Sequence, residues 1–152
     1  MGEDKDPMEV EEAIAALNRA LALQARSPLA FAHAAAGVRG LSHQAVGSQL
    51  WAFASAELDD YRRLAEKIVA LGGEPTTEVS ELRSHDELEE AVRWLAAVES
   101  EAVEALAEVI PHAGNEGPGE ALEHLLEHVI LRKQEQVDWL VRAVGDTAAT
   151  RD

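Results

Sequence analysis

Apolar residues recur along this chain at alternating steps of three and four in four separate segments. This spacing predicts α-helices that each bury one face, because residues three and four apart lie on the same side of a helix. The predicted helices cover about residues 8–36, 45–71, 85–110 and 119–144. The pattern therefore predicts an all-α protein.

Prolines and glycines mark the expected ends of these helices. Pro7 is a favourable first-turn residue for the first helix, and the pair Gly72-Gly73 is a typical signal for the end of the second. Ser84, with Glu87 three residues later, predicts a capping box at the start of the third helix, which we expect to end at Pro111.

The connections between the helices predict the topology. The first and third connections are short and favour antiparallel helical hairpins, whereas the middle one, GGEPTTEVSELRSHD, is longer. Two hairpins joined by a long crossover form a ferritin-like four-helix bundle. We expect residues 1–152 to form one such domain, with the crossover passing over an end of the bundle.

Composition agrees with a single helical domain. Ala, Leu, Val and Glu dominate the 152 residues, a length that suits one sizeable core. The chain has no cysteine, which excludes disulfides, thiolate metal sites and cysteine nucleophiles.

The charge argues against several classes of partner. With 29 acidic and 13 basic side chains the formal net charge is −16, which repels nucleic acid and anionic membranes and attracts cations. The N-terminal residues MGEDKDPMEV have no basic and apolar pattern like that of a signal peptide, and no apolar run approaches 18 residues. We therefore expect a cytoplasmic protein with no nucleic-acid or membrane partner.

Each of the four apolar stripes is interrupted by polar residues near its middle. Antiparallel helices of similar length bring their midpoints together, so these side chains are expected to meet in one central polar layer: Gln24, Glu57, Asp60, Glu99, Lys133 and Gln136. Glu57 and Asp60 are three residues apart and share a helix face. Three buried carboxylates would repel one another without a cation, which is either a metal ion or the Lys133 ammonium.

Three segments resemble bacterioferritin-type members of the ferritin-like family. ELDDYRRLAEKIVALGGEPT resembles the second helix of that family and the turn after it, ESEAVEALAEVIPHA resembles the third helix, and VDWL resembles part of the fourth. The resemblance extends over nearly the whole chain and implies a di-iron site. That site takes one Glu from the first helix, Glu-x-x-His from the second, one Glu from the third and Glu-x-x-His from the fourth.

This sequence departs from the implied ligand set. Glu57 and Glu99 match it, and Asp60 replaces a histidine but is still able to ligate a metal. Gln24 replaces a bridging carboxylate, and Lys133 and Gln136 replace the last Glu and His. A protonated lysine does not ligate metals, so this is a poor site for two divalent ions. A rotated fourth helix that turned Glu135 inward would sacrifice the apolar stripe.

Three interpretations of the layer follow. The favoured one is a metal-free network in which Lys133 pairs with Glu57 and Glu99, in a protein with a structural, assembly or binding role and no ferroxidase activity. The alternative is an oxidoreductase that binds iron or manganese through Glu57, Asp60 and Glu99. The third is a small-molecule pocket in the bundle core, for which the only signal is the run AFAHAAAG.

The resemblance also bears on haem and assembly. The methionine that ligates haem in bacterioferritins corresponds to Leu58, so no haem is implied. The chain ends soon after the fourth predicted helix, without the short fifth helix of ferritin cages. We therefore expect a homodimer or small homo-oligomer and not a 24-subunit iron store.

One short motif suggests different chemistry. Residues 124–128 spell the H-x-x-E-H pattern of some zinc proteases, but Leu122, Leu126 and Val129 define the buried side of that helix. His124 and His128 are therefore expected on its exposed flank.

Overall fold

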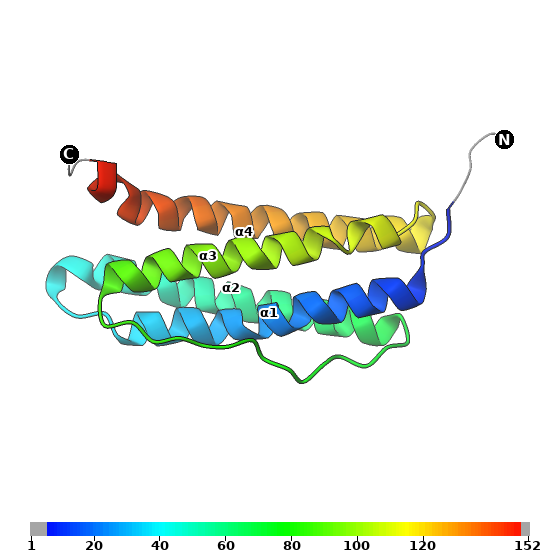
Figure 1. The fold of residues 1–152 in the computed structure, drawn as a ribbon, viewed down its shortest axis with the longest axis horizontal. Helices are drawn as coiled ribbons and strands as arrows, with labels where there is room; N and C mark the ends of the chain where they lie inside the picture. Colours follow the sequence, from blue (N-terminus) through cyan, green and yellow to red (C-terminus); the bar gives the residue numbers. More distant parts are fainter. Residues whose placement is uncertain (1–5, 150–152) are drawn as a thin grey trace.

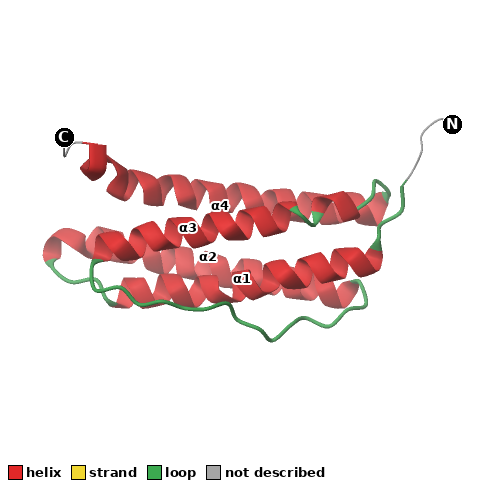
Figure 2. Cartoon of the chain, viewed as in Figure 1, coloured by secondary structure: helices red, strands yellow, loops and turns green. Residues whose placement is uncertain are grey.

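Four long helices form the molecule (Figures 1 and 2). The computed structural model describes residues 6–149, with side chains for residues 6–144. The helices are α1 (Val10–Ala36), α2 (Gln44–Ala70), α3 (Leu88–Ala107) and α4 (Gly117–Ala149), and short 3₁₀ turns cover Leu41–His43 and Ile110–His112. No helix in this part of the chain is long and apolar enough to cross a membrane. The predicted all-α bundle is confirmed.

The helices pair as two antiparallel hairpins, α1 with α2 and α3 with α4, and α1 packs against α3. The predicted ferritin-like topology is therefore confirmed, but the path of the crossover differs from our expectation. Residues 71–87 run along the length of the bundle and not across its end (Figure 1). The backbone N–H of Thr76 donates to Asn18 at 2.8 Å and that of Ser80 donates to the Ala22 carbonyl at 3.0 Å, so α1 holds the crossover in place.

The helix ends show where local signals were misleading. α1 begins at Val10, so Pro7 lies outside its first turn; the Glu9 N–H donates to the His112 carbonyl at 2.9 Å, which draws the preceding chain towards the α3–α4 turn. α3 begins at Leu88 with no side-chain cap bond from Glu87, and the predicted capping box is therefore wrong.

Two other ends have clear backbone causes. α3 stops at Ala107, before Pro111, because a proline has no N–H to donate to the carbonyl four residues earlier. α2 stops at Ala70, and Gly72 follows with φ 95°, a left-handed conformation that glycine adopts without strain. α4, which we predicted to end at about residue 144, continues to Ala149.

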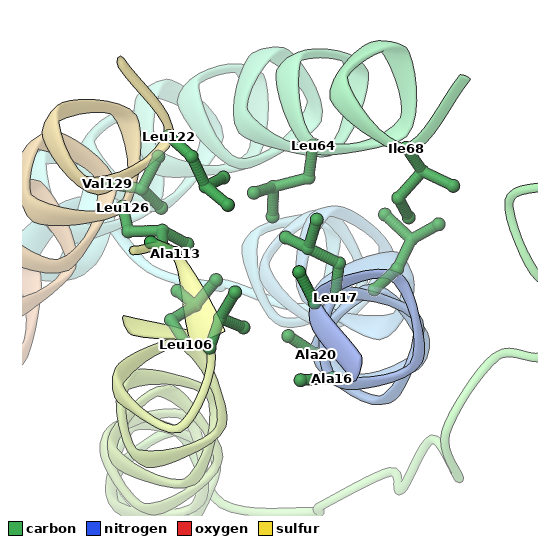
Figure 3. Packing of buried hydrophobic residues seen from close by; sticks show 13 residues of the cluster. Ala16, Leu17, Ala20, Leu64, Ile68, Leu106, Ala113, Leu122, Leu126 and Val129 are labelled. Carbon is green, nitrogen blue, oxygen red and sulfur yellow. The ribbon is translucent and has the colours of Figure 1, made fainter. Parts of the chain in front are cut away.

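Two apolar clusters fill the bundle on either side of its middle. Figure 3 shows the first, where Leu17, Leu64, Leu106 and Leu126 of the four helices converge. The second lies towards the other end and includes Phe31, Leu50, Leu95 and Leu140. The polar layer lies between them in sequence on every helix, so its charges are sealed by apolar packing along the bundle axis.

Candidate functional site: a buried ionic layer

The structure brings the six predicted polar residues together in the middle of the bundle. Each is almost completely buried, with 0 to 3% of its surface exposed: Gln24, Glu57, Asp60, Glu99, Lys133 and Gln136. α1 contributes one of them, α2 two, α3 one and α4 two. Glu135 is exposed, so α4 has the expected rotation and not the alternative one.

Lys133 links the two glutamates of this layer. Its Nζ donates to Glu57 Oε1 at 2.5 Å and to Glu99 Oε1 at 3.1 Å, with Glu99 Oε2 at 3.3 Å. All three side chains are completely buried. A charged lysine is tolerated there because its ammonium has three donors and finds carboxylate acceptors on both sides.

The two amides complete the hydrogen bonding of Glu57. Gln136 Nε2 donates to Glu57 Oε2 at 2.7 Å and to Glu99 Oε1 at 3.3 Å. Gln24 Nε2 donates to Glu57 Oε1 at 2.9 Å and to the Glu57 main-chain carbonyl at 2.8 Å. The Gln24 Oε1 atom is buried and has no partner among the described residues. The amides therefore act as donors that surround carboxylates.

Two further residues of the network, Ser27 and Arg132, were not predicted from the sequence. Ser27 Oγ donates to Glu99 Oε2 at 2.8 Å. Arg132, only partly buried, donates from Nη2 to Glu57 Oε2 at 2.9 Å and from Nε to Asp60 Oδ2 at 2.9 Å, and its Nη1 also donates to Gln136. Asp60 is thus held by the guanidinium of Arg132, on the solvent side of the layer.

Burial and the neighbouring charges shift the pKa values of the two glutamates in opposite directions. Burial on its own would raise the pKa of Glu57, but the Lys133 ammonium beside it, with further hydrogen bonds and Arg132, lowers that pKa from 4.5 to about 2. Burial raises the pKa of Glu99 from 4.5 to about 7, against the attraction of Lys133 and with added repulsion from Glu57. A proton on Glu99 leaves two carboxylates against two cations.

The pKa values of Asp60 and Lys133 are also shifted by burial and by the charges around them. Burial raises the pKa of Asp60, although the hydrogen bond and charge of Arg132 act in the opposite direction. Burial alone would lower the pKa of Lys133, but Glu99 and Glu57 overcome that effect and raise it. Lys133 is therefore charged, and it is the completely buried cation of the layer beside the partly exposed Arg132.

These donors do not fit a di-metal centre. The Lys133 ammonium lies within hydrogen-bonding distance of both glutamates, and amide N–H groups occupy other carboxylate lone pairs. Among residues 6–144, no group of three or more His, Cys, Asp or Glu side chains is arranged to hold a metal ion. Two divalent ions would need more anionic ligands and the removal of this positive charge.

Residues of the other predicted motifs lie elsewhere. His124 and His128 are exposed on α4, as their flank position predicted. Several residues of the AFAHAAAG run line a cavity at the end of the bundle, whereas its Phe31 and Ala35 pack in the second apolar cluster.

Comparison with known proteins agrees with the topology. A family model for the ferritin-like domain matches residues 14–149. A crystal structure of ferritin-like, diiron-carboxylate proteins from Bacillus anthracis superposes with a TM-score of 0.79 and 26% sequence identity, over 89% of this chain and 96% of that one. No curated protein matches the sequence. The chain belongs to the ferritin-like domain family.

Proposed function

We propose that this protein is a bacterioferritin-type ferritin-like bundle in which an ion-pair network stands in place of the di-metal centre. Its role is then structural, in assembly or in binding, without ferroxidase activity. The observation that carries the proposal is the Lys133 ammonium between Glu57 and Glu99, at 2.5 and 3.1 Å. It supplies the positive charge that the buried carboxylates require.

The similarity to a crystal structure of ferritin-like, diiron-carboxylate proteins supports a second candidate. In it, iron or manganese bound by Glu57, Asp60 and Glu99 supports an oxidoreductase reaction. The metal would have to displace Lys133 from Glu57 and Glu99 and Arg132 from Asp60, and each displacement leaves a buried or half-buried cation without its partner.

Elemental analysis and an oxygen electrode separate the two candidates. We expect the purified native chain to carry no stoichiometric iron or manganese and, when ferrous iron is added in excess, to consume oxygen no faster than the same iron does in buffer without protein. The matched control is the quadruple variant Gln24→Glu, Asp60→His, Lys133→Glu, Gln136→His, which rebuilds the family's ligand pattern and should bind up to about two irons per chain. Circular dichroism checks that the variant folds.

A different metal content would support the metal-dependent candidate. Iron or manganese that survives purification of the native chain, and is lost in the Glu57→Ala, Glu99→Ala double variant, would establish the metal-dependent candidate. Lys133→Glu with Gln136→His provides a second, less disruptive gain-of-binding variant if the quadruple one does not fold.

A further inference from the structure

A cavity of about 570 Å³ lies at the end of the bundle, away from the ionic layer. Its walls come from the end of α1, the α1–α2 turn, the last residues of the crossover and the start of α3, which gather at the left end of Figure 1. Its volume is in the range of pockets that take small organic molecules, roughly 300–1,000 Å³.

The cavity is lined by an unusual excess of cationic and imidazole side chains: His33, Arg39, His43, Arg83 and His85. Asp86 is the only acid among the described residues that line it. In a chain with 29 acidic and 13 basic side chains, the opposite balance would be expected by chance. With the histidines neutral, the formal charge of the lining is therefore +1, opposite in sign to the net charge of the chain.

The two arginines have guanidinium groups that are available to a ligand. Within residues 6–144, neither Arg39 nor Arg83 forms an ion pair, whereas Arg62, Arg93 and Arg132 each pair with a carboxylate. Guanidinium groups bind carboxylate and phosphate oxygens through paired hydrogen bonds. Both arginines are exposed, so they are able to turn towards an anion.

The histidines add polar groups to the same cavity. Nδ1 of His85 is buried and has no partner among the described residues, an unfavourable state for a polar atom. His33 Nε2 lies 3.2 Å from Ser84 Oγ, so this serine hydroxyl is also held at the cavity. A ligand with oxyanion acceptors would match these groups.

Other residues of the lining are apolar: Ala30 and Ala34 of α1, Leu88 and Ala91 of α3, and the half-buried ring of Trp94. The Trp94 ring also packs beside the His85 ring, with the two centroids 5.4 Å apart. A flat or aliphatic group would be sheltered from water against these apolar residues.

We propose that this cavity binds a small organic anion. A carboxylate or phosphate group contacts Arg39 and Arg83, and the apolar part of the molecule packs on Trp94 and the alanines. The proposal is independent of the presence or absence of metal in the ionic layer.

Isothermal titration calorimetry on the full chain tests this assignment with phenyl phosphate, benzoate and inorganic phosphate. We expect phenyl phosphate to bind more tightly than inorganic phosphate, because only the former places a ring on Trp94. Its affinity relative to benzoate distinguishes a phosphate from a carboxylate ligand. Arg39→Gln with Arg83→Gln should weaken binding by about tenfold or more, as charge-assisted hydrogen bonds are lost.

Arg19→Gln is the matched control. Arg19 is exposed on α1, outside the cavity lining, so its substitution changes the net charge without touching the cavity and should alter affinity by less than about twofold. Absence of binding by the folded native chain at about 10 mM of each probe would overturn the proposal. Equal weakening by Arg19→Gln and by the Arg39→Gln, Arg83→Gln double variant would also overturn it, because the effect would then come from net charge and not from contacts in the cavity.

Discussion

Lys133 is completely buried, yet its surroundings favour the charged form. Removing an ammonium from water is unfavourable by several kcal/mol, and only close, well-directed acceptors offset that loss. Here Glu57 and Glu99 supply three carboxylate oxygens within 3.3 Å. The lysine and the glutamates are therefore interdependent, and loss of one partner leaves the other charges buried without compensation.

Lys133→Ala is expected to lower the free energy of unfolding by roughly 3 to 5 kcal/mol, because it strands Glu57 and Glu99 in the core. Urea denaturation at pH 7 measures the change. Lys67→Ala on α2 is the control; Lys67 is partly exposed, and its loss should shift stability by less than about 1 kcal/mol. Equal unfolding midpoints for the two variants would show that the Lys133 ion pairs contribute nothing to the free energy of unfolding.

The raised pKa of Glu99 predicts that the stability of the protein depends on pH. Its pKa is raised from 4.5 to about 7 in the folded protein, so its proton stabilises the fold. That contribution is complete below pH 4.5 and is lost as the pH rises towards about 7. Glu57, with its pKa lowered to about 2, acts in another window, where stability is lost as the pH falls from 4.5 towards 2.

Glu99→Gln should therefore reduce the difference in unfolding free energy between pH 5 and pH 8 by on the order of 1 to 3 kcal/mol. Urea titrations at pH 5, 6, 7 and 8 measure it in the native chain and the variant. Glu104→Gln, at an exposed position of the same helix, should keep the native pH dependence. Parallel curves for Glu99→Gln and the native chain would contradict the assignment of a proton to Glu99.

Periodicity was sufficient to identify most, but not all, of the layer's residues. Gln24, Glu57 and Glu99 interrupt apolar stripes, and interruption is visible in one sequence. Ser27 lies three residues after Gln24 and shares its face, so the same spacing could have found it. Arg132 could not be found in this way, because it lies off the stripe and reaches the carboxylates through its long side chain.

At the scale of the elements, the four helices were predictable and their ends were less so. The interior of each helix is specified by many apolar positions at once, whereas an end depends on one or two backbone hydrogen bonds. Pro7 illustrates this difference. It suits a first turn, but the bond from Glu9 to the distant His112 carbonyl sets the chain path there, and nothing local in the sequence encodes that contact.

The crossover shows a second limit. Its length predicted a connection between hairpins but not its route, which depends on where acceptors and donors lie on α1. Asn18 receives the Thr76 N–H and donates to the Glu74 carbonyl at 3.0 Å, and Arg26 reaches the Glu81 carbonyl at 3.3 Å. These pairs are separated by more than fifty residues, so short-range sequence patterns do not contain them.

At the scale of the whole molecule, we propose that the chain forms a homodimer or small homo-oligomer. Trp51 and Leu58 on α2 are 51% and 59% exposed, and they lie two helical turns apart on one face. An exposed tryptophan with an apolar neighbour on the same face is typical of a contact surface.

Trp51→Glu with Leu58→Glu is expected to convert the assembly to monomers, because burying two carboxylates at an interface is unfavourable. Sedimentation equilibrium measures the mass. Val141→Glu, an equivalent change at a 51% exposed position of α4, should leave the assembly intact. A native chain that is already monomeric at micromolar concentration would refute this proposal.

Lys133 also has a consequence for how the protein folds and matures in a cell. A cation that is part of the polypeptide arrives with the chain during synthesis, in fixed stoichiometry, and neutralises Glu57 as soon as the helices come together. The proposed metal-free network implies that maturation of this core requires no delivery of a nutrient ion, and we expect its folding to be unaffected by a chelator or by a period of iron starvation.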